Sequence, residues 1–77
     1  MQSGRLYVEG LRYSITEEKV TVLFSHYGVV RWVEMVPGKS FGFVEMSNES
    51  EAERAKEALD GSRFEGVRLK VEEDRRY

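Results

Sequence analysis

Two aromatic side chains and a lysine recur at every second position near the middle of the chain. Phe41 and Phe43 follow Lys39 at this spacing, and residues two apart in an extended strand project from the same face. The residues that alternate with them are small or apolar: Ser40, Gly42, Val44 and Met46. A strand of this kind packs its small face on helices and exposes its rings. Exposed rings can stack on nucleobases, so the segment predicts a nucleic-acid-binding surface.

A second segment, Leu6-Tyr7-Val8-Glu9-Gly10-Leu11, alternates in the same way. Leu6 and Val8 fall on one side of the predicted strand. The other side carries the remaining residues: Arg5, Tyr7 and Glu9. Two strands that each expose aromatic rings predict one shared platform, with Tyr7 beside the two phenylalanines.

The turn pair Pro37-Gly38 lies between two strand-like runs and predicts a hairpin. An even-numbered loop centred on this pair sets Glu34 opposite Phe41 and Trp32 opposite Phe43. Because Pro followed by Gly suits a two-residue hairpin loop poorly, we expect a four-residue loop. Trp32 therefore joins the aromatic face.

Two amphipathic helices are predicted around this hairpin. The first follows Thr16 as a capping residue and ends at Gly28. Its apolar face has helical spacing: Val20, Leu23, Phe24 and Tyr27. The second begins within residues 47–50 and ends at Gly61. Its expected inward residues are small or apolar: Ala52, Ala55 and Leu59.

A last strand is predicted over residues 67–72, with Leu69 and Val71 facing inward. Arg68, Lys70 and Glu72 alternate with them and share the aromatic face. The order of elements is strand, helix, strand, strand, helix, strand. With right-handed crossovers this order predicts an α+β, ferredoxin-like split βαβ fold, βαββαβ, in which two helices back a four-stranded antiparallel sheet.

Length and composition limit the possible functions. The chain has 77 residues and is expected to form a single domain over 1–77, with an ordered core of about 5–72 and flexible segments at 1–4 and 73–77. Cysteine is absent and histidine occurs once. These counts leave no obvious apparatus for hydrolytic or metal chemistry, so we expect no enzyme activity and no cofactor.

The charge and the apolar runs bear on partners and location. A net charge of −2 argues against a strongly electrostatic nucleic-acid binder. No apolar run approaches the roughly 18 residues of a membrane-spanning helix, and the N-terminus lacks the character of a signal peptide. The absence of cysteine suits a reducing compartment. We therefore expect a soluble, intracellular monomer without a membrane partner.

Taken together, the two aromatic segments resemble the paired signatures of the RNA-recognition-motif family. The longer family signature is K/R-G-F/Y-G/A-F-V-x-F/Y. It is matched here at five positions: Lys39, Phe41, Gly42, Phe43 and Val44. Ser40 stands where the family has Gly, and Met46 stands where it has Phe or Tyr. Both departures fall on the predicted inward face, and the resemblance covers residues from about 5 to 72.

The resemblance implies how a short single-stranded RNA, or single-stranded DNA, would be bound. Tyr7 and Phe43 would each stack on one base, while Phe41 would pack between the sugars of the two nucleotides. Lys39 would contact a phosphate. Trp32 lies outside both signatures and either contacts a base or covers the edge of the sheet.

Charged side chains on the same face are expected nearly to cancel. The acidic residues are four: Glu9, Glu34, Glu45 and Glu72. The basic residues are also four: Arg5, Lys39, Arg68 and Lys70. Of these, Arg5 and Lys70 join Lys39 as candidate RNA contacts, whereas Arg68 is expected to be solvated.

Two other readings remain open. Some members of this fold bind a peptide tryptophan through Arg-x-Phe in the loop after the second helix, and the corresponding loop here reads Ser62-Arg63-Phe64. The arginine is one place away from that pattern and the aromatic platform is complete, which favours nucleic acid. The third reading is self-association through Trp32 and the face of the sheet.

Overall fold

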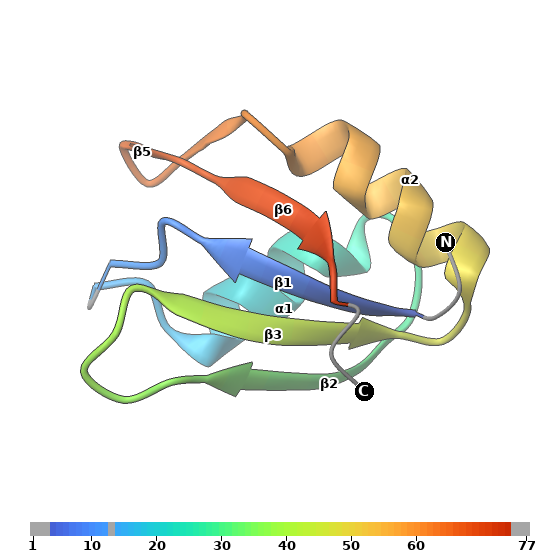
Figure 1. The fold of residues 1–77 in the computed structure, drawn as a ribbon, viewed down its shortest axis with the longest axis horizontal. Helices are drawn as coiled ribbons and strands as arrows, with labels where there is room; N and C mark the ends of the chain where they lie inside the picture. The colour runs from blue at the N-terminus through green and yellow to red at the C-terminus, as the bar shows by residue number, and fades with distance from the viewer. Residues whose placement is uncertain (1–3, 13, 75–77) are drawn as a thin grey trace.

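The structure, a computed structural model, describes residues 4–12 and 14–74. Its elements follow in the order β1 (Arg5–Glu9), α1 (Glu17–Ser25), β2 (Val30–Met35), β3 (Phe41–Met46), α2 (Glu49–Leu59), β4 (Arg63–Phe64), β5 (Val67–Arg68) and β6 (Lys70–Glu73). Four strands form an antiparallel sheet in the order β2-β3-β1-β6, and β4 pairs with β5 alone. Both helices lie on one side of this sheet (Figure 1). The predicted class, a four-stranded sheet backed by two helices, is confirmed.

One apolar core fills the space between the sheet and the helices. The strands contribute the residues that alternate with the aromatic positions, among them Leu6, Val8, Val44 and Val71, all at most 1% exposed. The helices contribute the predicted inward residues: Val20, Phe24, Ala52, Ala55 and Leu59. Burial of this apolar surface is the main stabilising term for a domain without disulfides.

Side-chain caps fix where each helix begins. The Lys19 N–H donates to the Thr16 hydroxyl at 3.2 Å, and the Glu51 N–H donates to the Asn48 side chain at 2.8 Å. Each cap satisfies a backbone donor that has no partner inside its helix. The first helix ends at Ser25, which is earlier than the predicted stop at Gly28.

The β2–β3 hairpin has the predicted faces but a different register. Trp32 lies opposite Glu45 and Glu34 lies opposite Phe43, so the expected pairs were wrong by two residues. The turn is closed by the Lys39 N–H, which donates to the Val36 carbonyl at 3.1 Å. Because side chains alternate with a period of two, a two-residue shift leaves residues 32–35 on their expected faces. The register changes again between Val30 and Trp32, where the ladder is irregular.

Gly42 allows β2 and β3 to approach each other closely. A Cβ atom at this position would lie 2.5 Å from the Glu34 carbonyl oxygen, which is too close for any other residue without backbone movement. The close approach of β2 to β3 therefore requires glycine at this position of the long signature.

The predicted last strand is divided into two parts. The first part, β5, pairs with β4 in a small hairpin, and only β6 joins the main sheet. The Leu69 N–H donates to the Ser62 carbonyl at 2.8 Å, at the point where the chain leaves the hairpin. Glu65 and Gly66 form the turn with φ of 53° and 82°. This left-handed pair is typical of a two-residue hairpin loop.

The ordered core extends beyond its predicted end at residue 72. Glu73 belongs to β6, and Asp74 is buried, with its N–H donating to the Arg5 carbonyl at 2.9 Å. At the other end, the Gly4 carbonyl accepts a bond of 2.7 Å from the Met46 N–H. The segments expected to be flexible thus include three residues that are hydrogen-bonded to the sheet or belong to it. The remaining segments of that prediction, 1–3 and 75–77, lie outside the described residues.

Candidate nucleic-acid interface

Three aromatic rings form a continuous cluster on the face of the sheet that the helices leave open. Tyr7 of β1 lies directly opposite Phe43 of β3, with ring centroids 5.8 Å apart. Phe41 completes the triangle at 5.5 Å from Tyr7 and 6.2 Å from Phe43. Each residue is half-buried, and the rings are tilted or edge-on to one another. We call Tyr7, Phe41 and Phe43 the aromatic platform.

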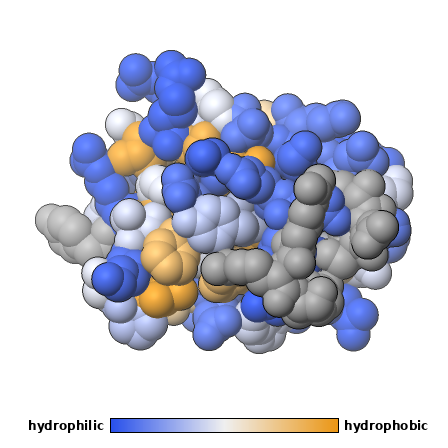
Figure 2. Space-filling view, in the orientation of Figure 1, coloured by the Kyte–Doolittle hydropathy of each residue, from blue (hydrophilic) through white to orange (hydrophobic). Residues whose placement is uncertain are grey.

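Figure 2 shows this side of the molecule, with apolar side chains gathered over β3 among hydrophilic ones. The buried residues between the platform positions determine the orientation. Leu6 lies opposite Val44, and both are at most 1% exposed. Since adjacent side chains of a strand point to opposite faces, their burial directs Tyr7 and Phe43 outward. The predicted shared face of the two signatures is therefore confirmed.

Arg5 lies between Trp32 and the platform. Its guanidinium carbon is 4.5 Å from the centroid of the Trp32 ring and 5.0 Å from that of Phe43. Its Nε donates to the Asp74 carboxylate at 2.6 Å. Trp32 itself is 38% exposed. The arrangement extends the aromatic surface towards β2 through a stacked cation, an attractive geometry for a guanidinium group and an indole ring.

The other edge of the platform carries hydrogen-bonded charged groups. Lys70 lies opposite Glu9 and forms an ion pair of 3.0 Å with Glu72. The hydrogen bond to Glu72, together with the charges of Glu72 and Glu9, raises the pKa of Lys70. The Tyr7 hydroxyl donates to Glu9 at 2.6 Å. This contact holds the ring that faces solvent and keeps its polar end satisfied.

Two predicted basic residues lie outside the strands of the main sheet. Lys39 is exposed in the loop before β3, and Arg68 belongs to the β4–β5 hairpin. The cross-strand paired positions of the face therefore have two basic groups, Arg5 and Lys70, against the four glutamates expected there. Two positive and four negative charges give −2, so these paired positions are acidic rather than nearly neutral as predicted.

The two departures from the long signature have different consequences. Met46 is 1% exposed and belongs to the core, as expected. Ser40 is exposed in the loop, so the expectation that it faces inward was wrong. Its carbonyl accepts bonds from the N–H groups of Gly10 at 3.0 Å and Leu11 at 2.8 Å. It therefore joins the loop before β3 to the end of β1 through its backbone.

The described part of the chain contains no group of three or more His, Asp or Glu side chains that could hold a metal ion. Neither of its helices is long and apolar enough to cross a membrane. What the open face offers is ring surface, hydrogen-bonding carboxylates and a small number of cations. These groups can stack on and hydrogen-bond to planar heterocycles.

A four-stranded sheet that exposes three clustered rings defines a class of small α+β binding modules. The chain belongs to the RNA recognition motif family, whose model matches residues 6–70. That range includes both aromatic signatures and both helices, and it ends at the first residue of β6.

Curated relatives and solved structures agree with this family. The chain is 39% identical to a putative RNA-binding protein, RbpA, of Nostoc sp., over 86% of this chain and 71% of that protein. RbpB of the same organism is 40% identical, over 86% and 70%. A crystal structure of RNA binding protein PG1 has a TM-score of 0.87 and 38% identity, covering 97% of this chain and 98% of that one. In the Caenorhabditis elegans NONO-1 homodimer the TM-score is 0.85 at 30% identity, over 95% of this chain but only 31% of that chain.

Proposed function

We propose that this domain binds a short segment of single-stranded RNA on the open face of its sheet, without catalysis. The observation that carries the proposal is the contiguity of Tyr7, Phe41 and Phe43, with ring centroids 5.5–6.2 Å apart. Tyr7 and Phe43 each offer a ring for one base, and Phe41 packs against the two sugars. Relatives that are named RNA-binding proteins support RNA as the ligand class.

Base stacking supplies most of the affinity in this proposal. Each stacked base contributes about 1–3 kcal/mol, and ordering the RNA strand offsets part of this gain. Two or three stacked bases then correspond to a dissociation constant on the order of micromolar. Phosphates gain little from a surface with four glutamates, so charge is not the main source of affinity on the open face.

Four further residues have supporting roles. Arg5 contacts both Trp32 and Phe43 and lies beside any base stacked on Phe43. Trp32 extends the stacking surface to a further base or covers the edge of the sheet. Lys70 borders Tyr7 across Glu9 and Glu72. Lys39, in the exposed loop before β3, contacts a phosphate of the bound strand.

A direct test is to titrate a random-sequence RNA decamer into the isotope-labelled protein and follow amide shifts by NMR. We expect the largest shifts in β1 and β3, around the platform residues. Trp32 is the sole tryptophan, so its fluorescence reports whether RNA also reaches β2. Shifts confined to the helices would contradict the proposal. A DNA decamer of the same composition measures the preference for RNA.

The peptide-binding alternative has weaker support. Phe64 is partly buried and packs against the core from the small hairpin, so its ring is not displayed for a peptide tryptophan. Self-association through Trp32 would appear in light scattering of the free protein, for which we expect the mass of a monomer.

A further inference from the structure

Two arginines face each other across the small hairpin. Arg63 of β4 lies directly opposite Arg68 of β5, and both are exposed. Directly opposed side chains share one face of a hairpin, so the two arginines project from neighbouring positions. Like charges in this position destabilise a strand pair. Within residues 4–12 and 14–74 neither arginine forms an ion pair that would relieve the repulsion.

The hairpin turns this arginine pair towards solvent. Its other cross-strand pair, Phe64 and Val67, is partly buried and packs against the core. Alternation therefore directs the arginines away from the core. Arg68 Nη1 donates to the Gly61 carbonyl at 3.4 Å, a long bond that leaves most of the guanidinium donors for other contacts.

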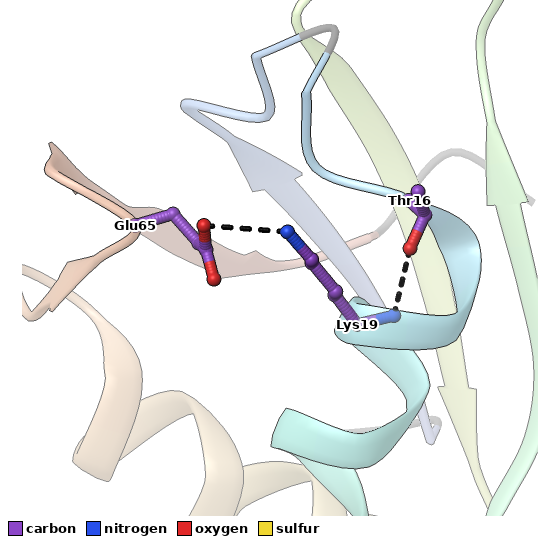
Figure 3. A network of polar contacts seen from close by, with 3 residues as sticks. All are labelled: Thr16, Lys19 and Glu65. Atoms are coloured by element: carbon purple, nitrogen blue, oxygen red, sulfur yellow. Dashed lines mark hydrogen bonds and ion pairs between the residues drawn. The ribbon is translucent and has the colours of Figure 1, made fainter.

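Charge at the hairpin turn is neutralised from a different element. Lys19 Nζ of α1 lies 3.4 Å from the Glu65 carboxylate, while the Lys19 backbone N–H donates to the Thr16 hydroxyl. Figure 3 shows both contacts. Glu65, the acidic residue nearest to the two arginines in sequence, is thus paired with Lys19 and not with an arginine. The same contact ties the turn to the start of α1 and helps to fix the hairpin.

The hairpin adjoins the platform at the end of β1. A Cβ atom on Gly10 would lie 2.7 Å from the Arg68 carbonyl oxygen, so the backbone of β5 lies against the residue that follows Glu9. Arg68 is separated from Lys70 only by Leu69, which is buried. Arg68 and Lys70 therefore both project away from the core. A bound RNA strand that continued from Tyr7 over β6 would reach the arginine pair next.

We infer that Arg63 and Arg68 bind the phosphodiester backbone of RNA that extends past the platform over the β1–β6 edge. This inference rests on the proposed function. Guanidinium groups donate paired hydrogen bonds to phosphate oxygens, and an anion between two of them removes their repulsion. The paired strand positions of the open face supply little of this attraction, because their charges sum to −2. Stacking and phosphate binding are thus divided between two neighbouring surfaces.

The test compares Arg63→Gln/Arg68→Gln with the parent, using a labelled random-sequence RNA decamer at about 50 and about 200 mM salt. Each phosphate contact to single-stranded RNA contributes about 0.7 to the slope of log affinity against log salt. When two contacts are lost, the affinity of the variant should fall about sevenfold less than that of the parent between these two salt concentrations. A dinucleotide pool, which supplies only the two bases proposed to stack on Tyr7 and Phe43, should bind both proteins equally. Arg54→Gln/Lys56→Gln on α2 is the matched control and should keep the parent's slope.

The possible outcomes separate this inference from the proposed function. If Phe43→Ala weakens decamer binding but the arginine variant keeps the parent's slope and affinity, the inference is overturned and the platform stands. An equal effect in the α2 control also overturns it, because the charge effect is then not local to the hairpin. If the parent binds no RNA, the proposed function fails and the inference fails with it. Urea melts should show the arginine variant at least as stable as the parent, since a like-charge pair has been removed.

Discussion

Arg5 stacks on Trp32, with 4.5 Å between the guanidinium carbon and the ring centroid, while its Nε is bonded to Asp74 at 2.6 Å. Arg5 belongs to β1 and Trp32 belongs to β2, and β3 lies between these two strands in the sheet. The contact thus bridges across β3 and passes over Phe43. It links the end of the described chain to the aromatic surface through one side chain.

Arg5→Ala should lower the free energy of unfolding by about 1–3 kcal/mol, since it removes a stacked cation and a charged hydrogen bond to a buried carboxylate. The emission of Trp32 should shift to longer wavelength as water replaces the guanidinium group. Urea melts followed by tryptophan fluorescence measure both effects. Arg31→Ala, an exposed arginine of the same β2 strand as Trp32, is the control and should change neither. Unchanged emission in Arg5→Ala would show that the stacked geometry is not maintained in solution.

Salt dependence tests whether stacking rather than charge dominates binding. The paired strand positions of the open face are acidic, so only a few phosphates can be neutralised, at Lys39 and at the arginine pair of the small hairpin. Three contacts at about 0.7 each give a slope of log affinity against log salt of about −2. Decamer affinities at several salt concentrations give this slope. A slope steeper than about −4 would mean that many phosphates are bound and that the platform is not the main contact.

The faces of the strands were predictable because alternation is a local property. Leu6 and Val44 are apolar between polar or aromatic neighbours, and burial of these two residues determines where Tyr7 and Phe43 point. A period of two survives any error in strand ends or in an even register. This is why Trp32 lies on the expected face although its predicted cross-strand partner was wrong.

Contacts between distant parts of the chain were not predictable in the same way. Asp74 meets Arg5 across 69 positions of sequence, and nothing in the residues around Asp74 indicates that it is buried. The small hairpin had a local signal that was missed: Glu65-Gly66, between Arg63-Phe64 and Val67-Arg68, is a two-residue Xaa-Gly loop. Its strands have two residues each, too few for alternation to reveal them.

Acid should destabilise the domain partly through Glu51. Its carboxylate accepts hydrogen bonds from the Ser47 hydroxyl and from the Val29 N–H at 3.0 Å, and these bonds lower its pKa from the ordinary 4.5. A lowered pKa in the folded state means that the stabilisation is fully present above about pH 4.5 and is lost as the pH falls through the folded value.

Glu51→Gln should therefore reduce the loss of stability between about pH 5 and pH 3, measured as the urea midpoint at each pH. Glu53→Gln, at an exposed position of the same helix, should keep the parent's profile. Identical acid profiles for Glu51→Gln and the parent would mean that the bonds from Ser47 and Val29 contribute nothing to the pH dependence.

Replacing Phe41 and Phe43 together with Ala should separate binding from folding. Both rings are half-buried on the open face. The loss of stability per residue should therefore stay well below the roughly 3–5 kcal/mol of a fully buried Phe→Ala substitution. RNA affinity should fall by on the order of 2–4 kcal/mol, because one stacked base and the packing between sugars are lost. Urea melts and RNA titrations of the same variant measure the two quantities.

Val44→Ala is the matched control on the opposite face of the same strand. Val44 is 1% exposed, and removing two methyl groups from the core should cost about 2 kcal/mol of stability, including the cavity left behind. Its folded fraction should still bind RNA like the parent, since Val44 does not reach the open face. If the double aromatic variant unfolds instead, the rings are core residues. If it stays folded and binds RNA like the parent, stacking on β3 is not how this domain recognises RNA, and the peptide-binding reading becomes the better one.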